Sequence, residues 1–121
     1  MKRIFAIVVV FVAIAANSYA LDLNEYRVFY KLTNEKTFDS LNRYLNTTSE
    51  QEDQLKYIFS LTEKKMKNAV TSENEKEAEK TMWFNLGNVK YVLSNDQYKK
   101  YLVAINLSVN SNNNEFFAEN K

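Results

Sequence analysis

The sequence predicts an all-α protein, a small antiparallel helical bundle built around a helical hairpin with capped starts. The chain has no proline and a single glycine, so it is poor in the residues that form turns. Apolar residues recur at helical spacing along most of its length. Three segments also match a capping box, in which a Ser or Thr and a Gln or Glu three residues later cap a helix start.

The first 20 residues have the pattern of a cleaved signal peptide. Lys2 and Arg3 precede an apolar run over residues 4–16, and Ser18-Tyr19-Ala20 supplies the small residues of a signal-peptidase site. The 13 residues of the run are fewer than the roughly 20 that a membrane-spanning helix needs. We therefore expect an exported protein, periplasmic or secreted, with no integral membrane segment after cleavage.

Composition argues against several classes of function. The absence of His and Cys removes the commonest general base, the usual ligands of zinc and any disulfide. The net charge of +1 and the lack of a basic block argue against a nucleic-acid partner. Glu50, Glu52 and Asp53 stand beside an expected helix start, where carboxylates complement the helix dipole. We expect no enzyme activity and no cofactor or metal.

The mature chain begins with a segment that fits two structures. In residues 21–32, Leu23, Tyr26 and Phe29 recur as in a helix, whereas alternate residues from Tyr26 to Leu32 are apolar as in a strand. We favour the helix and leave the strand open. A short second helix should follow through Tyr44, capped at Thr33 or Asn34, with an inner face of Phe38, Leu41 and Leu45.

Two long helices come next. The first should run from Thr48 or Ser49 to about Ala69 or Val70, with Thr48 and Gln51 as its capping box. Its apolar stripe is Leu55, Ile58, Phe59, Thr62, Met66, Ala69 and Val70. The second should begin at a box formed by Ser72 and Glu75 and continue to about Val92, with a stripe of Ala78, Met82, Leu86, Val89 and Leu93. Gly87 within it indicates a close helix crossing or a bend.

The last helix should begin at a box formed by Ser94 and Gln97. Its apolar side is Tyr98, Tyr101, Leu102, Ile105 and Val109. Residues 110–121 are rich in asparagine, and we expect a flexible tail. The helical domain would then span residues 21–109.

The paired boxes resemble a known family. The segment L-N-T-T-S-E-Q (45–51), a helical hairpin, and L-S-N-D-Q-Y-K-K-Y-L (93–102) are similar to the L-T-x-x-Q family of small periplasmic helical proteins, the Spy-like envelope-stress chaperones. The resemblance covers about residues 45–105. It implies that Thr48, Gln51, Ser94 and Gln97 are structural motif residues. Thr47 stands in place of the first motif leucine, Ser94 replaces the second motif threonine, and the basic, Met- and Arg-rich cradle is not evident.

Five apolar residues fall outside the main stripes and form the candidate protein-binding set: Tyr57, Leu61, Trp83, Phe84 and Tyr91. If they are exposed together, they would bind an apolar client. If they are buried, they belong to a wide core face of a bundle. The functional hypotheses are a chaperone-like envelope binding protein with an unfolded client, or an accessory interaction domain with one dedicated partner or a homodimer.

Overall fold

The computed structural model describes residue 23 and residues 25–111, and in this part of the chain every regular element is a helix. The elements are the 3-10 helix η1 (Glu25–Tyr30) and the α-helices α2 (Glu35–Leu45), α3 (Ser49–Thr71), α4 (Glu75–Val92) and α5 (Asn95–Ser111). The all-α class expected from the sequence is confirmed.

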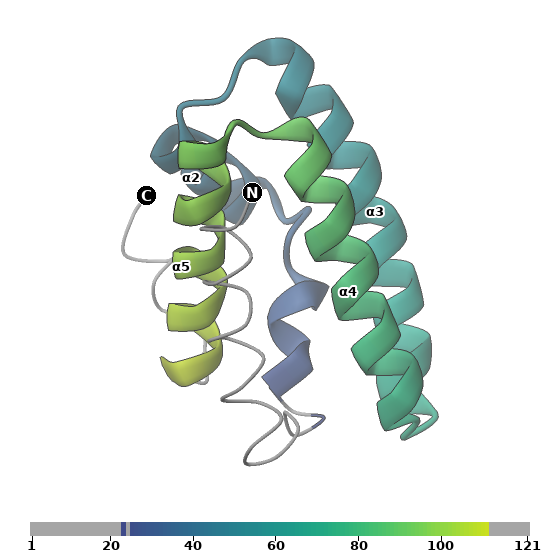
Figure 1. Ribbon diagram of the computed structural model, residues 1–121. Coiled ribbons are helices and arrows are strands. Elements are labelled where there is room, and N and C mark those ends of the chain that lie inside the picture. Colours follow the sequence, from purple (N-terminus) through teal and green to yellow (C-terminus); the bar gives the residue numbers. More distant parts are fainter. Residues whose placement is uncertain (1–22, 24, 112–121) are drawn as a thin grey trace.

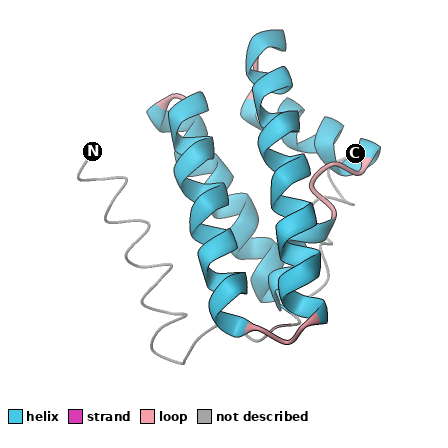
Figure 2. Cartoon of the chain, turned by 90° about the vertical axis from the view of Figure 1, so that its right-hand side faces the viewer, coloured by secondary structure: helices cyan, strands magenta, loops and turns pink. Residues whose placement is uncertain are grey.

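The two longest helices, α3 and α4, form an antiparallel hairpin. They lie side by side and are joined at one end by a short loop (Figures 1 and 2). The element η1 packs against α3, α4 and α5, and α5 also packs against α2 and α4. One face of the hairpin is therefore covered by η1 and α5, whereas no described element covers the opposite face.

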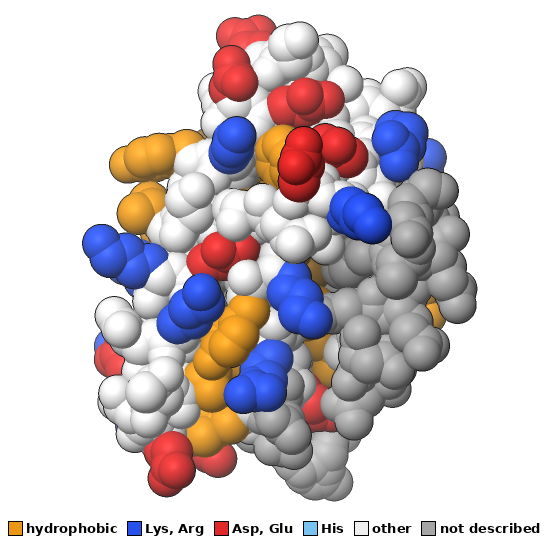
Figure 3. Space-filling view, turned by 180° about the vertical axis from the view of Figure 1, so that it is seen from behind, with side chains coloured by type: hydrophobic (Ala, Val, Ile, Leu, Met, Phe, Trp, Pro, Cys, Tyr) orange, Lys and Arg blue, Asp and Glu red, His pale blue; other side chains and the backbone are white. Residues whose placement is uncertain are grey.

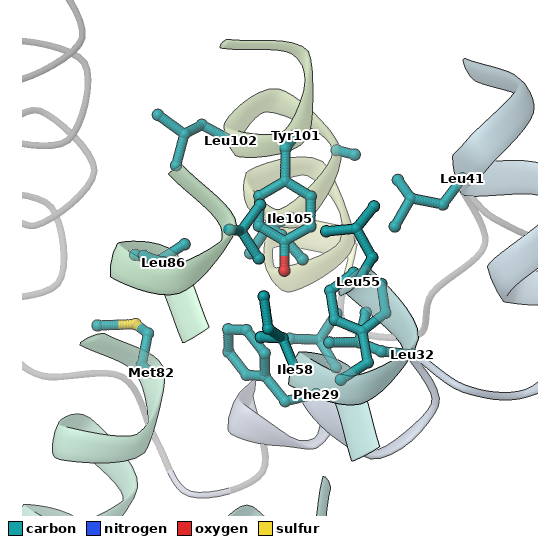
Figure 4. Close-up of a cluster of buried hydrophobic side chains, with 14 of the residues drawn as sticks. Phe29, Leu32, Leu41, Leu55, Ile58, Met82, Leu86, Tyr101, Leu102 and Ile105 are labelled. Carbon is teal, nitrogen blue, oxygen red and sulfur yellow. The ribbon is translucent and has the colours of Figure 1, made fainter. Parts of the chain in front are cut away.

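The apolar stripes expected from the sequence are the buried faces of the helices. In α3, α4 and α5 the stripe residues are buried, except that Val70 is half-buried. Figure 4 shows side chains from all these elements meeting in one cluster, including Leu55 and Ile58 of α3, Leu86 of α4 and Ile105 of α5. This single core holds the hairpin against η1 and α5.

The segment before α2 is a 3-10 helix, so the strand left open for residues 21–32 is wrong where the structure describes it. Tyr26, Val28 and Phe29 are all buried. A 3-10 helix has about three residues per turn, which aligns Tyr26 with Phe29. Because η1 contacts three helices, Val28 is covered as well. Apolar residues are therefore needed on more than one side of η1, and this produces a strand-like alternation beside the helical spacing.

Two of the three expected capping boxes form. The Thr48 hydroxyl accepts a hydrogen bond from the Gln51 N–H at 3.1 Å, and the Gln51 Oε1 accepts one from the Thr48 N–H at 3.0 Å. Ser94 and Gln97 make the same two bonds at 3.2 Å and 2.9 Å. Each box satisfies two backbone donors that a helix start leaves free.

The third box, expected at Ser72 and Glu75, does not form. The Ser72 hydroxyl donates to the Asn68 carbonyl at 2.8 Å, so this side chain is used at the end of α3. The chain turns through Glu73, which has a positive φ of 56°. The cap of α4 is Asn74, whose Oδ1 accepts from the Glu77 N–H at 3.2 Å. The hairpin turn thus moves the helix start two residues beyond Ser72.

The glutamines of the two boxes also bond to each other. Gln51 Nε2 donates to Gln97 Oε1 at 2.8 Å, and Gln97 Nε2 donates to Gln51 Oε1 at 3.2 Å. Gln51 Nε2 also donates to the Val92 carbonyl at 3.1 Å, and Gln97 Nε2 donates to the carbonyls of Leu45 and Asn46 at 3.2 Å and 3.3 Å. This paired amide joins the starts of α3 and α5 to the ends of α2 and α4.

A second polar connection runs through the core. The Tyr101 hydroxyl of α5 donates to Asn85 Oδ1 of α4 at 2.5 Å, and Asn85 Nδ2 donates to Thr62 Oγ1 of α3 at 3.1 Å. Thr62 in turn donates to the Ile58 carbonyl at 2.8 Å. All three side chains are buried, and Figure 4 shows Tyr101 pointing into the cluster. Buried polar groups with partners restrict how helices can pack, which fixes the relative height of α3, α4 and α5.

The ends of the chain fall largely outside this description. The expected signal peptide, residues 1–20, lies outside the described residues, as does the expected tail beyond residue 111. Helix α5 ends at Ser111, two residues beyond the expected end of the helical domain. In the part of the chain that the structure describes, no helix has the length and apolar character needed to cross a membrane.

We expect the paired glutamines to be energetically coupled. Gln51→Ala and Gln97→Ala should each lower the free energy of unfolding by roughly 1–3 kcal/mol, because each change leaves polar groups without partners. The double variant should lose less stability than the two single variants together, and the difference, the coupling energy, should be roughly 0.5–3 kcal/mol. Urea unfolding of the four proteins measures this cycle. Gln54→Ala, an exposed glutamine one turn along α3, is the matched control. Additive losses would contradict the pairing.

We also expect the fold to weaken at alkaline pH. Burial raises the pKa of Tyr98 from 10.0 to about 12, and burial with nearby Glu79 and Glu75 raises the pKa of Tyr26 to about 12. Burial also raises the pKa of Tyr101. The folded state thus favours the neutral phenols, so this stability is complete below pH 10.0 and is lost as pH rises through about 12.

Thermal unfolding across this range, with tyrosinate absorbance as the titration signal, tests the alkaline prediction. Tyr98→Phe should flatten the pH profile because one titrating group is removed, whereas Tyr91→Phe, at an exposed site, should leave the profile unchanged. A melting temperature that stays constant while the buried tyrosines ionise would contradict the assignment.

Candidate binding surface on the α3–α4 hairpin

The uncovered face of the hairpin carries two adjoining hollows between α3 and α4. The first, here the tyrosine groove, is lined by Asp53, Gln54, Tyr57, Ile58, Asn88, Tyr91 and Val92. The second, here the lysine pocket, is lined by Lys65, Asn68, Ala69, Ser72, Asn74, Glu77, Lys80, Thr81 and Phe84. At about 100° per residue these positions share one side of each helix. We call this side the outer face.

The tyrosine groove has two exposed aromatic rings on its rim. Tyr57 of α3 is 68% exposed and Tyr91 of α4 is 91% exposed. Ile58, which is 8% exposed, lies between the rim and the core. In the view from behind, hydrophobic side chains protrude at the upper left edge, the side of the hairpin, with Lys and Arg side chains below them (Figure 3). The core gains little from these two rings, so they are free to contact another molecule.

The middle of the outer face is only partly covered. Leu61 of α3 and Phe84 of α4 are half-buried. The Lys65 ammonium lies 5.1 Å from the centre of the Phe84 ring, within the range of a cation–π contact. Phe84 therefore has a neighbour from α3 on its exposed side. The Phe84 side chain is thus more buried than those of Tyr57 and Tyr91 and less buried than those of the core.

Trp83 does not share the outer face with the other four candidates. It lies about 100° around α4 from Phe84, and it is partly buried against the hydrophobic core. The structure thus brings together Tyr57, Leu61, Phe84 and Tyr91 and separates Trp83 from them. Helical spacing shows that Trp83 and Phe84 point in different directions from α4. Which of the two directions is covered depends on how η1 and α5 pack.

Charge is distributed unevenly along the outer face. Asp53 lines the tyrosine groove, whereas Lys65 and Lys80 line the lysine pocket. The Lys80 ammonium makes an ion pair with the Glu77 carboxylate, three residues earlier in α4, at an N–O distance of 3.6 Å. The tyrosine groove therefore has a carboxylate on its lining, whereas the lysine pocket has two ammonium groups and one carboxylate.

Sequence reasoning missed three contributors to this surface. Lys65 lies over the Phe84 ring, Asn88 lines the tyrosine groove, and Gly87 faces open space one turn before Tyr91. Gly87 is exposed, and a Cβ built there meets nothing within 4 Å, so the close crossing expected from the sequence is absent. The signal that could have found these residues is their offset of three or four positions from Tyr57, Leu61, Phe84 or Tyr91.

The outer face is lined by side chains suited to non-covalent contact. It offers aromatic rings, an aliphatic floor, amide groups and separated charges. Among the described residues, no three His, Cys, Asp or Glu side chains come together so that they could hold a metal ion. The carboxylates Glu50, Glu52 and Asp53 lie in the first turns of α3, where they complement its dipole.

We expect truncation of Phe84 and of Tyr91 to differ in their effect on stability. Phe84→Ala should cost about 1.5–2.5 kcal/mol, roughly half of the loss for a fully buried aromatic. Tyr91→Ala should change stability by less than about 0.5 kcal/mol, because its ring makes few contacts. Denaturant unfolding measures both. Equal losses at the two sites would contradict the burial described here.

Comparison with known proteins does not assign this surface. No family model matches the chain. No curated protein and no solved structure is significantly similar to it. The role of the outer face therefore has to be argued from its geometry and chemistry.

Proposed function

We propose that the protein is an exported, non-catalytic binding protein, chaperone-like in action, which holds apolar segments of other polypeptides on the outer face of its hairpin. The observation that carries this proposal is the pair of exposed rings, Tyr57 and Tyr91, on the rim of one groove. Aromatic residues are enriched where proteins bind one another, since they offer a large rigid contact area at low entropic cost.

The lining of the tyrosine groove indicates the kind of client. Its floor is aliphatic at Ile58 and Val92, and its rim adds the amides of Gln54 and Asn88. An apolar side chain of an unfolded polypeptide fits such a floor, while the amides can bond to an exposed peptide backbone. The contact is shallow and sequence-tolerant, which suits transient capture of many segments better than recognition of a small molecule.

Two features of the sequence support an envelope role. Residues 1–20 have the pattern of a signal peptide, which predicts export. The boxes at Thr48 and Ser94, whose glutamines pair in the fold, are the motifs on which the resemblance to the L-T-x-x-Q family rests. Because the basic, Met-rich cradle of that family is not evident, we assign client contact here to the tyrosines.

The test is suppression of the aggregation of a reduced, unfolded probe protein, α-lactalbumin. The double variant Tyr57→Ser/Tyr91→Ser should need at least about five-fold more protein for half-suppression, because exposed aromatic contacts dominate such binding. Its melting temperature should stay close to that of the parent protein. The matched control is Val103→Ser/Leu107→Ser on α5, which removes side chains that are 45% and 44% exposed away from the hairpin.

Two results would reject this proposal. Absence of suppression by the parent protein would exclude a chaperone-like role and leave an accessory domain with one dedicated partner as the better hypothesis. Equal loss of suppression in the tyrosine variant and in the α5 control would show that general surface hydrophobicity, rather than the tyrosine groove, holds the client.

A further inference from the structure

We propose that the lysine pocket is a carboxylate-binding subsite, which takes an acidic side chain of the same polypeptide whose apolar side chain lies in the tyrosine groove. The inference rests on the proposed function, because it names the class of client segment that the outer face holds. Three observations support it: the charge of the pocket lining, the hydrogen-bond donors that the pocket offers, and the distance from the pocket to the groove.

The lysine pocket is a hollow of about 360 Å³ between α3 and α4. Two residues of its lining, Ser72 and Asn74, belong to the loop that joins the helices, so the pocket lies at the loop end of the hairpin. Figure 2 shows the hairpin with this loop at the bottom. The pocket volume lies at the lower end of the range for small-ligand sites, so it suits a single side chain rather than a folded partner.

The lining of the pocket carries a surplus of positive charge. It includes the ammonium groups of Lys65 and Lys80 and one carboxylate, that of Glu77. The ion pair between Lys80 and Glu77 is weak, because both side chains are mostly exposed and lie three residues apart on one helix. Lys80 can therefore also bond to a carboxylate of another molecule. Complementarity of charge favours an anionic ligand.

The pocket also offers the donors that such an anion needs. The Lys65 ammonium lies 5.1 Å from the centre of the Phe84 ring, which places it at the pocket wall. Asn74 Oδ1 accepts the Glu77 N–H, which leaves the Asn74 amide nitrogen to donate to a ligand. The two hydroxyls of the lining instead donate to backbone carbonyls. A carboxylate can accept bonds from ammonium and amide groups at once, and its bonds to ammonium groups are the stronger ones.

The distance between pocket and groove fits one extended polypeptide. On α3, Lys65 comes eight residues after Tyr57, and on α4, Lys80 comes eleven residues before Tyr91. At a rise of about 1.5 Å per residue, these separations are about 12 Å and about 16 Å. Four residues of an extended chain cover about 13 Å, and the first and fifth side chains point to the same side. An apolar and an acidic residue four positions apart can therefore reach both hollows together.

The charge in the groove opposes the reverse placement. Asp53 lines the tyrosine groove, where an acidic client residue would meet a like charge. A basic client residue would in turn meet Lys65 and Lys80 in the pocket. The outer face should therefore favour client segments with an acidic residue at this spacing and discriminate against segments with a basic residue there.

Fluorescence anisotropy of short labelled peptides with blocked ends tests the proposal. The probe carries one phenylalanine and one glutamate four positions apart, in either order, among serines and glycines. Replacing the glutamate by glutamine should weaken binding by at least about five-fold, because bonds to a charged group are lost. Raising the ionic strength from about 0.05 M to about 0.5 M should remove most of this difference, because salt screens the charges.

The variant Lys65→Gln/Lys80→Gln assigns the preference to the pocket. It should bind the glutamate and glutamine peptides equally and keep its affinity for the glutamine peptide within about two-fold of the parent protein. The matched control is Lys56→Gln/Lys64→Gln, which removes the same charge from exposed sites of α3 outside the pocket lining. This control should keep the preference for glutamate. A preference that persists without Lys65 and Lys80, or that is lost equally in the control, would overturn the proposal.

The subsite and the proposed function fail separately. If the parent protein suppresses the aggregation of α-lactalbumin but binds both peptides equally, the subsite is rejected and the tyrosine groove keeps its role. If it prefers the glutamate peptide through Lys65 and Lys80 but suppresses no aggregation, the subsite stands and the chaperone-like role is rejected. A parent protein that binds neither peptide overturns the subsite, whatever the aggregation assay shows.

Discussion

The paired amides of Gln51 and Gln97 are the interaction on which the rest of the fold depends. Each glutamine caps its own helix start and bonds to the other, so the starts of α3 and α5 are held at one point. The same two side chains bond to the carbonyls at the ends of α2 and α4. These two side chains thus supply a partner to at least one free backbone group at each of four helix termini.

A second set of hydrogen bonds, between buried side chains near the middle of the helices, adds to this junction. Tyr101, Asn85 and Thr62 connect α5, α4 and α3 where a purely apolar interface would allow the helices to slide. Phe59 stacks on Tyr101, with ring centres 6.1 Å apart, and locks the tyrosine in place. The junction at the helix starts and this chain in the core together fix both the position and the height of the hairpin. Both connections therefore act on the hairpin that carries the outer face.

Tyr57 and Tyr91 differ in exposure from the other aromatic side chains near the surface. Tyr30 is bordered by Arg27 and Lys67, and Tyr44 by Lys100, each at a distance typical of a cation–π contact. Phe84 has Lys65 in the same way. Tyr57 and Tyr91 are the aromatic side chains that are mostly exposed in the described part of the chain.

The sequence by itself determined the helical class, the stripes that became buried faces, and the caps at Thr48 and Ser94. These features are local: helix period and capping depend on residues three or four positions apart. The cap at Ser72 failed because the preceding helix used that hydroxyl, and the choice between helix and strand around Tyr26 depended on what η1 contacts. The bond that Ser72 makes is itself local, to a carbonyl four residues back, but the residue pattern fits both bonds equally. The structure around Tyr26 depends on contacts with distant helices.

Only the tertiary structure decided which of the off-stripe aromatics are exposed. Trp83 and Phe84 are adjacent in sequence, yet one packs against the core and the other lies on the outer face, because η1 and α5 cover a single side of the hairpin. The pairing of Gln51 with Gln97, 46 residues apart, likewise needed the fold. Helical periodicity gives the direction of each side chain around its own axis, whereas the neighbour that it meets depends on how the helices are placed together.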